Sequence, residues 1–508
     1  MLIDETIVKE FAKLLLEISK ETAIKAHNYI LNHSKIYGYG KYPEKKEIFP
    51  KDKPEYLDLY EKIPYLIYDI PRYYERDYPE GMINYGGIFY NYTGDFLDCT
   101  SLEQFKVLIE YVNSQSELQK LIVQESNDLQ YKLKRIVVDI VERYMFATKA
   151  TANVPQNLEN VLQPFVAEKV RRYVEENLYI SIHIPICLAT FEDDRIELSE
   201  GVEIIRMSDE MQKSRQCSYT YESSKEDWVS ACATHAIVLS NYHFKNDGEL
   251  SINSATQNCY AYPLQTIDNI IAAIRIVTGC SIGYEQILSM PEGWIDSFHA
   301  DLIPLYGAKA HFVNPKELEK MWMHLPVSKV SHEQTNRIQQ VYQNITKCEG
   351  DKNKQNLLFA LKRFNRCMLR NEVDDMATDA TIGLEALLAG GTKGEITFTI
   401  SSRIPVVFSH VKNERFTPAN SRSIMKKIYG YRSKIVHGGN LKEKEKYVEI
   451  NSEKFETCDV AVDFLRYTLL FMTEHQEYLD AAKLDEYIDS ILSHKAVDAE
   501  EETTPETE

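Results

Sequence analysis

The sequence lacks the features of a secreted or membrane-spanning protein. Its first residues, Met1-Leu-Ile-Asp-Glu-Thr, have neither the basic start nor the apolar run of a signal peptide. No later stretch of the 508 residues reaches the roughly 18 consecutive apolar residues that a membrane span requires. With 44% hydrophobic residues the chain can bury a sizeable core, so we expect a globular, cytoplasmic protein that makes no contact with a membrane.

Closely spaced cysteines are also missing. The 9 cysteines are scattered along the chain, and no two lie closer together than Cys217 and Cys232. This spacing shows neither a Cys-x-x-Cys metal or redox site nor a compact disulfide framework. We expect buried thiols in a reducing compartment.

Positive charge is scarce in the chain as a whole but not in one segment. The net charge of -19 argues against a protein that binds nucleic acid indiscriminately. Between His410 and Lys446, however, ten Lys and Arg residues stand against three Glu residues, which gives a local charge of +7. This basic segment is either a solvated helix face with a lysine-rich loop or a surface for an anionic partner.

The first part of the chain mixes helical and strand periodicities. Apolar residues recur at helical spacing over residues 4–31, 101–149 and 161–176, and residues 42–92 read as loop with short strands. Isoleucines then alternate from Ile180 to Ile186, and apolar residues flank a turn at Glu200-Gly201. A helix around residues 267–274 should end near Gly279. We predict that residues 1–345 form an α+β region, which can contain two subdomains.

After the polar stretch 348–353, our predicted domain boundary, the pattern becomes almost wholly helical. We expect one helix around residues 357–368, a second capped by Asp374-Asp375 and stopping at Gly390-Gly391, a fifth capped by Ser452, and a sixth through residues 484–491. The third segment fits either a strand or a helix interrupted by Pro405. We therefore predict a helical bundle over residues 352–495 and a disordered acidic tail over residues 496–508.

The fourth helix carries the residues with the clearest chemical meaning. Thr417-Pro418 marks its start and Gly438-Gly439 its end. Arg432 and His437 would lie about 140° apart on an ideal helix, but His437 comes where the chain leaves the helix, within reach of a long Arg side chain. A guanidinium can hold a phosphate while an imidazole moves protons near neutral pH, so the pair suits phosphodiester cleavage.

Around this pair the sequence resembles a known family. The segment Ile428-Tyr-Gly-Tyr-Arg432-Ser-Lys-Ile-Val-His437-Gly, the run Leu384-Glu385-Ala-Leu-Leu in the second helix, and Arg403 in the third segment are similar to the ApeA-like branch of the HEPN domains (higher eukaryotes and prokaryotes nucleotide-binding). The likeness covers about residues 352–480, with a weaker likeness upstream. HEPN domains are helical bundles, and many are metal-independent endoribonucleases that act as dimers.

The resemblance implies a mechanism and a set of roles. His437 would be the acid or base for attack of the RNA 2′-hydroxyl on the adjacent phosphate, which leaves a cyclic phosphate, and Arg432 would stabilise the developing charge. Ser433, Glu385 and Arg403 would support the site. Lys426, Lys427 and Lys434 of the basic segment would contact RNA. The resemblance implies no metal or other cofactor. It does imply a homodimer that forms through the HEPN domain.

The same resemblance implies a biological role, and other readings stay open. The N-terminal region would sense an unknown phage-derived trigger, and the HEPN domain would then cut cellular RNA such as tRNA in abortive infection. Some HEPN toxins carry a regulatory Tyr two residues after the His, where this chain has Gly439. The alternative is a non-catalytic HEPN module that binds RNA or a protein partner. An enzyme within the first region is a third reading, although we find no nucleophile, paired-carboxylate or metal constellation there.

Overall fold

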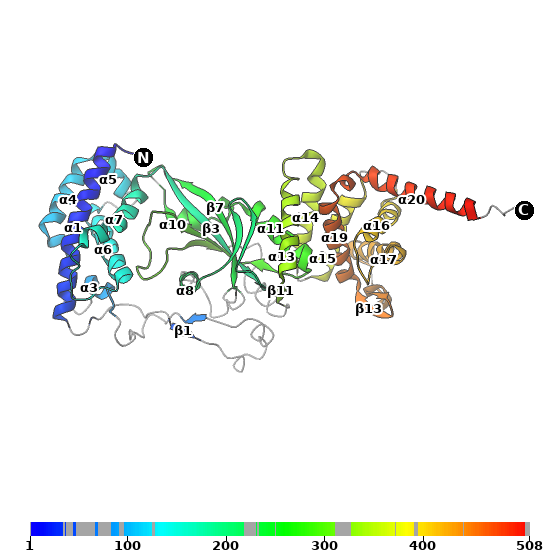
Figure 1. Ribbon diagram of the computed structural model, residues 1–508, viewed down its shortest axis with the longest axis horizontal. Helices are drawn as coiled ribbons and strands as arrows, with labels where there is room; N and C mark the ends of the chain where they lie inside the picture. Colours follow the sequence, from blue (N-terminus) through cyan, green and yellow to red (C-terminus); the bar gives the residue numbers. More distant parts are fainter. Residues whose placement is uncertain are drawn as a thin grey trace, which may run out of the picture. The chain divides into compact units, whose positions relative to one another are not determined.

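A computed structural model shows two compact units (Figure 1). It describes residues 2–33, 36, 44–46, 67–69, 83–90, 96–123, 128–217, 230, 233–248, 250–309, 327–370, 372–390, 395–439 and 441–502. The first unit comprises Met1–Cys187, Gly201–Tyr262 and Tyr284–Phe312, and the second comprises Leu188–Glu200, Pro263–Gly283 and Val313–Glu508.

The first unit opens with a group of helices, as the sequence pattern predicts. Helix α1 (Glu5–Asn32) starts at Asp4, whose side chain accepts a hydrogen bond of 2.7 Å from the backbone of Thr6. It packs against α4 (Glu103–Ser114), α6 (Leu129–Thr148) and α7 (Leu158–Val174). The short helices α3 (Gly86–Phe89) and α5 (Ser116–Val123) and the 3-10 turn η3 (Cys99–Ser101) complete this group. Its core is apolar and closely packed around Phe11, Leu15 and Ile18.

An antiparallel sheet forms the second part of the first unit. The five strands of this sheet that lie wholly in this unit run in the order β10 (Tyr306–Lys309), β9 (Gln286–Pro291), β3 (Asn177–Cys187), β7 (His235–Lys245) and β6 (Val202–Arg206). The isoleucines from Ile180 to Ile186 lie on β3, which confirms the predicted strand. Nearly every residue of β3 is buried, because strands pair with it on both edges and both of its faces are covered.

Shorter elements complete the first unit. They are α8 (Asp209–Cys217), α10 (Ile252–Gln257) and the 3-10 turn η4 (Cys259–Ala261). Within the predicted loop region 42–92, β1 (Glu44–Lys46) pairs antiparallel with β2 (Ile67–Asp69). The remainder of that region, apart from residues 83–90, lies outside the described residues. Strand β8 (Gly283–Tyr284) has its first residue in the second unit and its last in the first.

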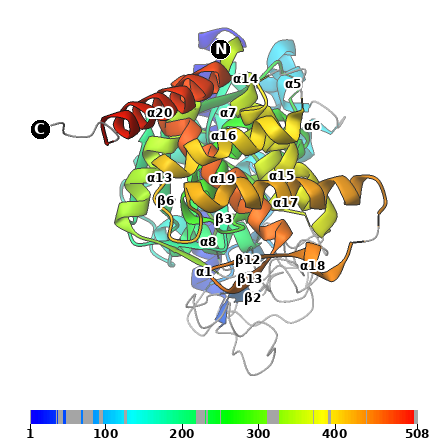
Figure 2. The same cartoon turned by 90° about the vertical axis from the view of Figure 1, so that its right-hand side faces the viewer.

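The second unit is mainly helical (Figure 2). Its longer helices are α11 (Leu264–Thr278), α13 (His332–Thr346), α14 (Gln355–Cys367), α15 (Val373–Leu388), α16 (Ile396–His410), α17 (Pro418–Val436), α19 (Thr457–Glu474) and α20 (Ala481–Glu502). Its smaller elements are β4 (Ala189–Phe191), β5 (Arg195–Ser199), β11 (Ser328–Val330), η5 (Lys352–Lys354), α18 (Glu443–Lys446), β12 (Tyr447–Ile450), β13 (Glu453–Glu456) and η6 (Gln476–Leu479). Strand β11 pairs in parallel with β4.

The glycine turns fall where the sequence suggests. Gly201 (φ 71°), Gly279 (φ 72°) and Gly390 (φ 58°) all adopt the left-handed conformation, which glycine reaches without strain. Gly279 closes α11 by donating its backbone N–H to the carbonyl oxygen of Arg275 at 2.8 Å. These turns confirm the predicted ends of the corresponding elements.

Two predicted helix starts are wrong. Asp374 and Asp375 lie inside the first turn of α15, whose N-cap residue is Glu372, so they favour the helix end through their charge and do not cap it. Ser452 does not start a helix either. It follows Asn451 in the two-residue turn of the β12–β13 hairpin, where both residues have positive φ (52° and 67°). Helix α19 begins after that hairpin, at Thr457.

The third segment of the bundle is a helix. Pro405 lies inside α16, where it removes one backbone donor without ending the helix. Burial of Ile400, Ile404 and Val407 on one face accounts for this, because packing of an apolar face stabilises a helix more than residue propensity does.

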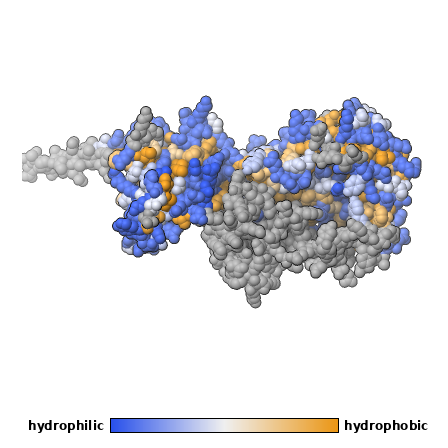
Figure 3. All heavy atoms as spheres, turned by 180° about the vertical axis from the view of Figure 1, so that it is seen from behind, coloured by the Kyte–Doolittle hydropathy of each residue, from blue (hydrophilic) through white to orange (hydrophobic). Residues whose placement is uncertain are grey.

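The predicted boundary and tail lie within larger elements. The polar stretch 348–353 falls inside the second unit, because α11 and α13 pack against α14 and α19. Helix α20 continues into the predicted tail as far as Glu502, through a run rich in Ala and Glu, which favour helix. Residues 503–508 lie outside the described residues. On the faces turned to the viewer in Figure 3, hydrophilic residues surround smaller hydrophobic areas.

Candidate functional site

The start of α17 is fixed by a capping box. The Thr417 hydroxyl accepts a hydrogen bond from the backbone of Asn420 at 3.3 Å, and the Asn420 side chain accepts one from the backbone of Thr417 at 2.9 Å. Pro418 occupies the first helical position, where its missing donor costs nothing. Ile424, Met425 and Ile428 then bury one face of the helix against its neighbours, so α17 is held firmly in register.

The end of α17 is a Schellman turn that contains His437. The backbone of Gly438 donates to Ile435 at 3.0 Å, that of Gly439 donates to Lys434 at 2.8 Å, and Gly438 has φ 64°. His437 is the C-cap residue, and it is exposed. The predicted helix end is confirmed, and the turn presents the imidazole at a fixed point on the surface.

Arg432 lies on another side of the same helix. At 100° and 1.5 Å per residue, its Cα is separated from that of His437 by about 140° around the axis and about 7.5 Å along it. Its guanidinium carbon is 5.9 Å from the centre of the Tyr429 ring, close enough for a cation–π contact. Its Nε is buried and has no hydrogen-bond partner among the described residues. Arg432 therefore keeps one buried donor that no described group satisfies.

Glu385 reaches this group through Tyr429. The Tyr429 hydroxyl donates a hydrogen bond of 2.5 Å to Glu385 Oε1 on α15. Burial raises the pKa of Tyr429 to about 12, and the hydrogen bond to Glu385 adds to that rise, so the hydroxyl remains a proton donor at neutral pH. Glu385, Tyr429 and Arg432 thus form one connected group, as the supporting role predicted for Glu385 requires.

Tyr429 was not predicted as a site residue. It lies three positions before Arg432, and this spacing places two side chains next to each other on a helix. Its proximity to Arg432 could therefore be predicted from the sequence. Its bond to Glu385 was not, because that bond depends on how α15 packs against α17.

Arg403 is used for packing between helices. It is 5% exposed, and its Nε and Nη2 donate to the two carboxylate oxygens of Asp485 on α20 at 2.9 and 2.7 Å. Its Nη1 donates to the carbonyl oxygen of Leu388 at 2.6 Å, which satisfies the end of α15. No described contact joins Arg403 to Arg432 or His437, so these bonds assign it a structural role instead of the supporting role expected from the sequence.

The remaining predicted residues differ in availability. Lys426 and Lys427 are exposed and form no ion pair with any residue that the structure describes. Lys434 instead binds Glu445 at 2.6 Å, and this hydrogen bond lowers the pKa of Glu445. Ser433 is partly buried. Lys426 and Lys427 are therefore open to an anionic partner, and Lys434 is engaged.

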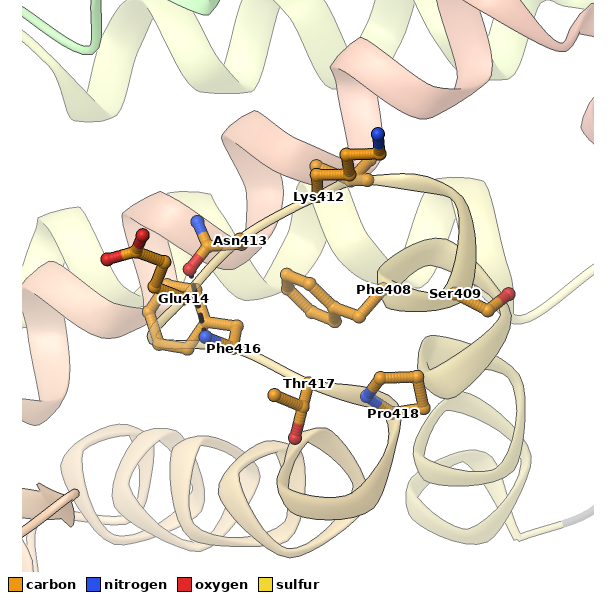
Figure 4. Close-up of a pocket in the computed structure, with 9 residues that line it drawn as sticks. Phe408, Ser409, Lys412, Asn413, Glu414, Phe416, Thr417 and Pro418 are labelled. Carbon is orange, nitrogen blue, oxygen red and sulfur yellow. Dashed lines mark hydrogen bonds between the residues drawn. The ribbon is translucent and has the colours of Figure 1, made fainter.

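A cavity lies at the other end of α17 (Figure 4). It has a volume of about 520 Å³ and is bounded by the turn that joins α16 to α17. The rings of Phe408 and Phe416, with centres 5.5 Å apart, contribute its apolar lining, and Lys412, Asn413 and Glu414 contribute polar groups. It is separated from His437 by the length of α17, about 27 Å, so it is not part of the predicted site.

The first unit contains a buried ionic cluster that sequence inspection missed. Lys169 donates to Asp139 at 2.8 Å, and Arg172 donates to Asp296 at 3.1 Å. Although burial alone would raise the pKa of Asp296, the charges of Arg172 and Lys169 lower it. These pairs join α6, α7 and the segment after β9, which are remote in sequence. Each charge has a partner of opposite sign, although Nη1 of Arg172 is buried without a hydrogen-bond partner among the described residues, and we assign the pairs to packing.

No protein-family model, curated protein or solved structure matches this chain. Among the described residues, no three or more His, Cys, Asp or Glu side chains are grouped so that they could hold a metal ion. None of the described helices has the length and apolar character needed to cross a membrane.

Proposed function

We propose that this chain is a metal-independent endoribonuclease of the HEPN type, with His437 as the acid or base and Arg432 as the residue that stabilises charge on the phosphate. The observation that carries the proposal is the surface of α17. An exposed His437 is fixed by a Schellman turn, and the partly buried Arg432 contacts the Tyr429 ring and has a buried Nε that no described group satisfies. Both belong to the basic segment of an acidic chain.

The proposed reaction needs only proton transfer and charge stabilisation. One base removes the proton of the RNA 2′-hydroxyl, whose oxygen attacks the adjacent phosphorus, and the 5′-oxygen leaves with a proton from an acid. The products are a 2′,3′-cyclic phosphate and a 5′-hydroxyl. An imidazole can serve as acid or base at neutral pH, and a guanidinium binds the phosphate oxygens by charge-assisted hydrogen bonds.

The separation of Arg432 and His437 within one chain favours a composite site. Because about 140° of helix surface lies between them, a homodimer would complete the site by bringing the α17 helices of two copies together. Mixing is the direct test. Arg432→Ala and His437→Ala proteins should each be inactive, and the mixed dimer should regain part of the activity. No recovery in a verified mixed dimer would contradict a site shared between copies.

Cleavage is tested with purified protein, RNA and EDTA. The wild-type protein should produce fragments that end in cyclic phosphate, and His437→Ala should produce none. His332→Ala is the matched control. The His332 side chain is also exposed (71% of its surface) and belongs to the second unit, but it lies on α13. Cleavage retained by His437→Ala would sink the assignment. The same assay with tRNA as the substrate tests whether tRNA is the cellular RNA that the protein cleaves.

The biological role is a further part of the proposal and rests on the resemblance alone. The protein would act in the cytoplasm in abortive infection, with the N-terminal region, residues 1–345, responding to a phage-derived trigger. Cells that express the wild-type protein should resist phage, and cells that express His437→Ala should not. Equal protection by the two proteins would separate any defence role from RNA cleavage.

A second candidate function is a non-catalytic module that binds RNA or a protein partner. In its favour, ideal helix geometry separates Arg432 and His437 of one chain by about 140° around the axis of α17. Such a module would retain RNA, or a protein partner, without releasing products, so the EDTA assay combined with RNA retention distinguishes the two functions.

A further inference from the structure

We infer that a single RNA strand binds along α17, with its phosphates on a stripe from Arg422 to His437 and one base stacked on Phe398. This inference deepens the proposed function, because it rests on His437 being at the point of cleavage. It assigns binding roles to Arg422, Phe398 and Gly430, and it excludes two of the lysines that the sequence suggested.

The stripe follows from the geometry of α17. At 100° per residue, Arg422, Lys426, Ser433 and His437 fall within about 60° of one another around the axis. They extend over about 22 Å, at about 6 Å for each step of four residues. Arg422, Lys426 and His437 are exposed, and Ser433 is partly buried. One face of α17 therefore presents two cations and a hydroxyl in a line that leads to the imidazole.

The two cations on this stripe are available. Neither Arg422 nor Lys426 forms an ion pair with a residue that the structure describes. Lys427 points about 100° away from Lys426, and Lys434 is held by Glu445 at 2.6 Å. Only part of the basic segment can therefore line one strand of phosphates, and the stripe contains Arg422 and Lys426 but neither Lys427 nor Lys434.

An exposed aromatic ring lies beside the far end of the stripe. Phe398, in the first turn of α16, is 56% exposed, and the guanidinium carbon of Arg422 is 5.6 Å from the centre of its ring. An exposed ring beside a cation can stack an unpaired base while the cation binds the adjoining phosphate. This arrangement favours single-stranded RNA, because the bases of a duplex are already stacked on one another.

Gly430 is an independent observation on the same face. It lies in the middle of α17, where glycine is less favourable than alanine. A Cβ added there would meet nothing within 4 Å, so packing within the chain does not require glycine. Its position is about 40° from Lys426 and about 20° from His437. The missing side chain leaves room for a strand to approach the helix backbone between these residues.

Binding is tested on the full-length His437→Ala protein, so that cleavage does not consume the probe. The probe is a labelled single-stranded RNA of about 12 nucleotides, longer than the stripe needs, and its affinity is measured by fluorescence anisotropy over a range of salt concentrations. Arg422→Ala and Lys426→Ala should each weaken binding and reduce the slope of log K against log salt by about 0.7. Lys427→Ala removes the same charge next to Lys426 on another side of the helix, and it should change neither value.

Two further variants test the ring and the glycine. Phe398→Ala should weaken binding by roughly 5- to 10-fold at fixed salt without changing the salt slope, and should reduce any preference for single-stranded over duplex RNA. Gly430→Leu should bind about 10-fold more weakly while its thermal midpoint stays the same or rises, because leucine is the better helix former. A loss of binding together with a lower midpoint would mean damage to the fold and would count against the role of Gly430.

The outcomes separate this inference from the proposed function. If Lys427→Ala weakens binding as much as Arg422→Ala, or if Phe398→Ala binds as the parent does, the stripe is wrong even when the wild-type protein cleaves RNA. If the stripe variants behave as expected but the wild-type protein yields no cyclic phosphate, the stripe stands and the nuclease proposal fails.

Discussion

The contact between Tyr429 and Glu385 makes a quantitative prediction about the site. Its 2.5 Å hydrogen bond joins a phenol to a carboxylate, a type that contributes about 1.5–3 kcal/mol when buried. Both side chains are partly exposed, so we reduce the expected contribution to about 1 kcal/mol. Tyr429→Phe and Glu385→Gln should therefore each lower the stability of the second unit by about 1 kcal/mol.

A double-mutant cycle isolates this contact. The double variant should be little less stable than either single variant, with a coupling energy of about 0.5–1 kcal/mol. The same cycle should appear in RNA cleavage, because Tyr429 supports Arg432: we expect each single variant to lower kcat/KM by about 10-fold, equivalent to about 1.4 kcal/mol. The pH profile should keep its shape, since the pKa of Tyr429, about 12, lies above the usual assay range.

Stability is measured by thermal unfolding, which is monitored with signals assigned to each unit. Cleavage is measured in single-turnover assays on the same preparations. Lys427→Ala serves as a control for an unrelated change on the same helix. Two results would refute the reasoning: stability losses that simply add in the double variant, or full cleavage activity in Tyr429→Phe with its melting midpoint lowered. The second result would leave Tyr429 a structural residue only.

Three further predictions concern the fold around the site and the first unit. Arg403→Ala should destabilise the second unit by about 2–4 kcal/mol, because it leaves the Leu388 carbonyl and Asp485 without their partner, while cleavage per folded molecule stays unchanged; a cleavage defect in folded protein would restore Arg403 to the site. Gly438→Val should cost about 1–2 kcal/mol at φ 64° and speed hydrogen exchange at the end of α17, and unchanged exchange there would contradict the role of the turn. Burial raises the pKa of Glu142 from 4.5 to about 8. Between pH 4.5 and about 8, Glu142 is therefore protonated in the folded state and ionised in the unfolded state. The thermal midpoint of the first unit should therefore fall as pH rises through that range and should fall less in Glu142→Gln, and equal slopes would refute the assignment.

Local sequence signals were sufficient for most of the helices and for both ends of α17. Thr417-Pro418 and Gly438-Gly439 are short-range signals, since a cap or a left-handed glycine depends on neighbours within a few residues. The two wrong helix starts, at Asp374-Asp375 and at Ser452, were also predicted from short-range signals. An Asp or Ser before an apolar run can cap a helix, occupy its first turn or form a hairpin turn, and the choice depends on where adjacent elements pack.

For the site, the sequence alone determined which residues lie near each other along α17, because helix periodicity gives that much. It placed Arg432 and His437 five residues apart at the end of a helix and located the basic segment around them. Whether α16 was a helix stayed open until the burial of its apolar face was known. The resemblance supplied the proposed chemistry, which neither composition nor periodicity could give.

Tertiary structure alone decided which side chains are engaged and which are free. Arg403 and Glu385 looked equivalent as supporting residues, yet packing turns Arg403 toward Asp485 and Leu388 and brings Glu385 to Tyr429. These partners come from different helices, so no spacing along the chain predicts them. Ion pairing likewise engages Lys434 while Lys426 stays open, because a lysine's availability depends on whether folding brings a carboxylate within reach.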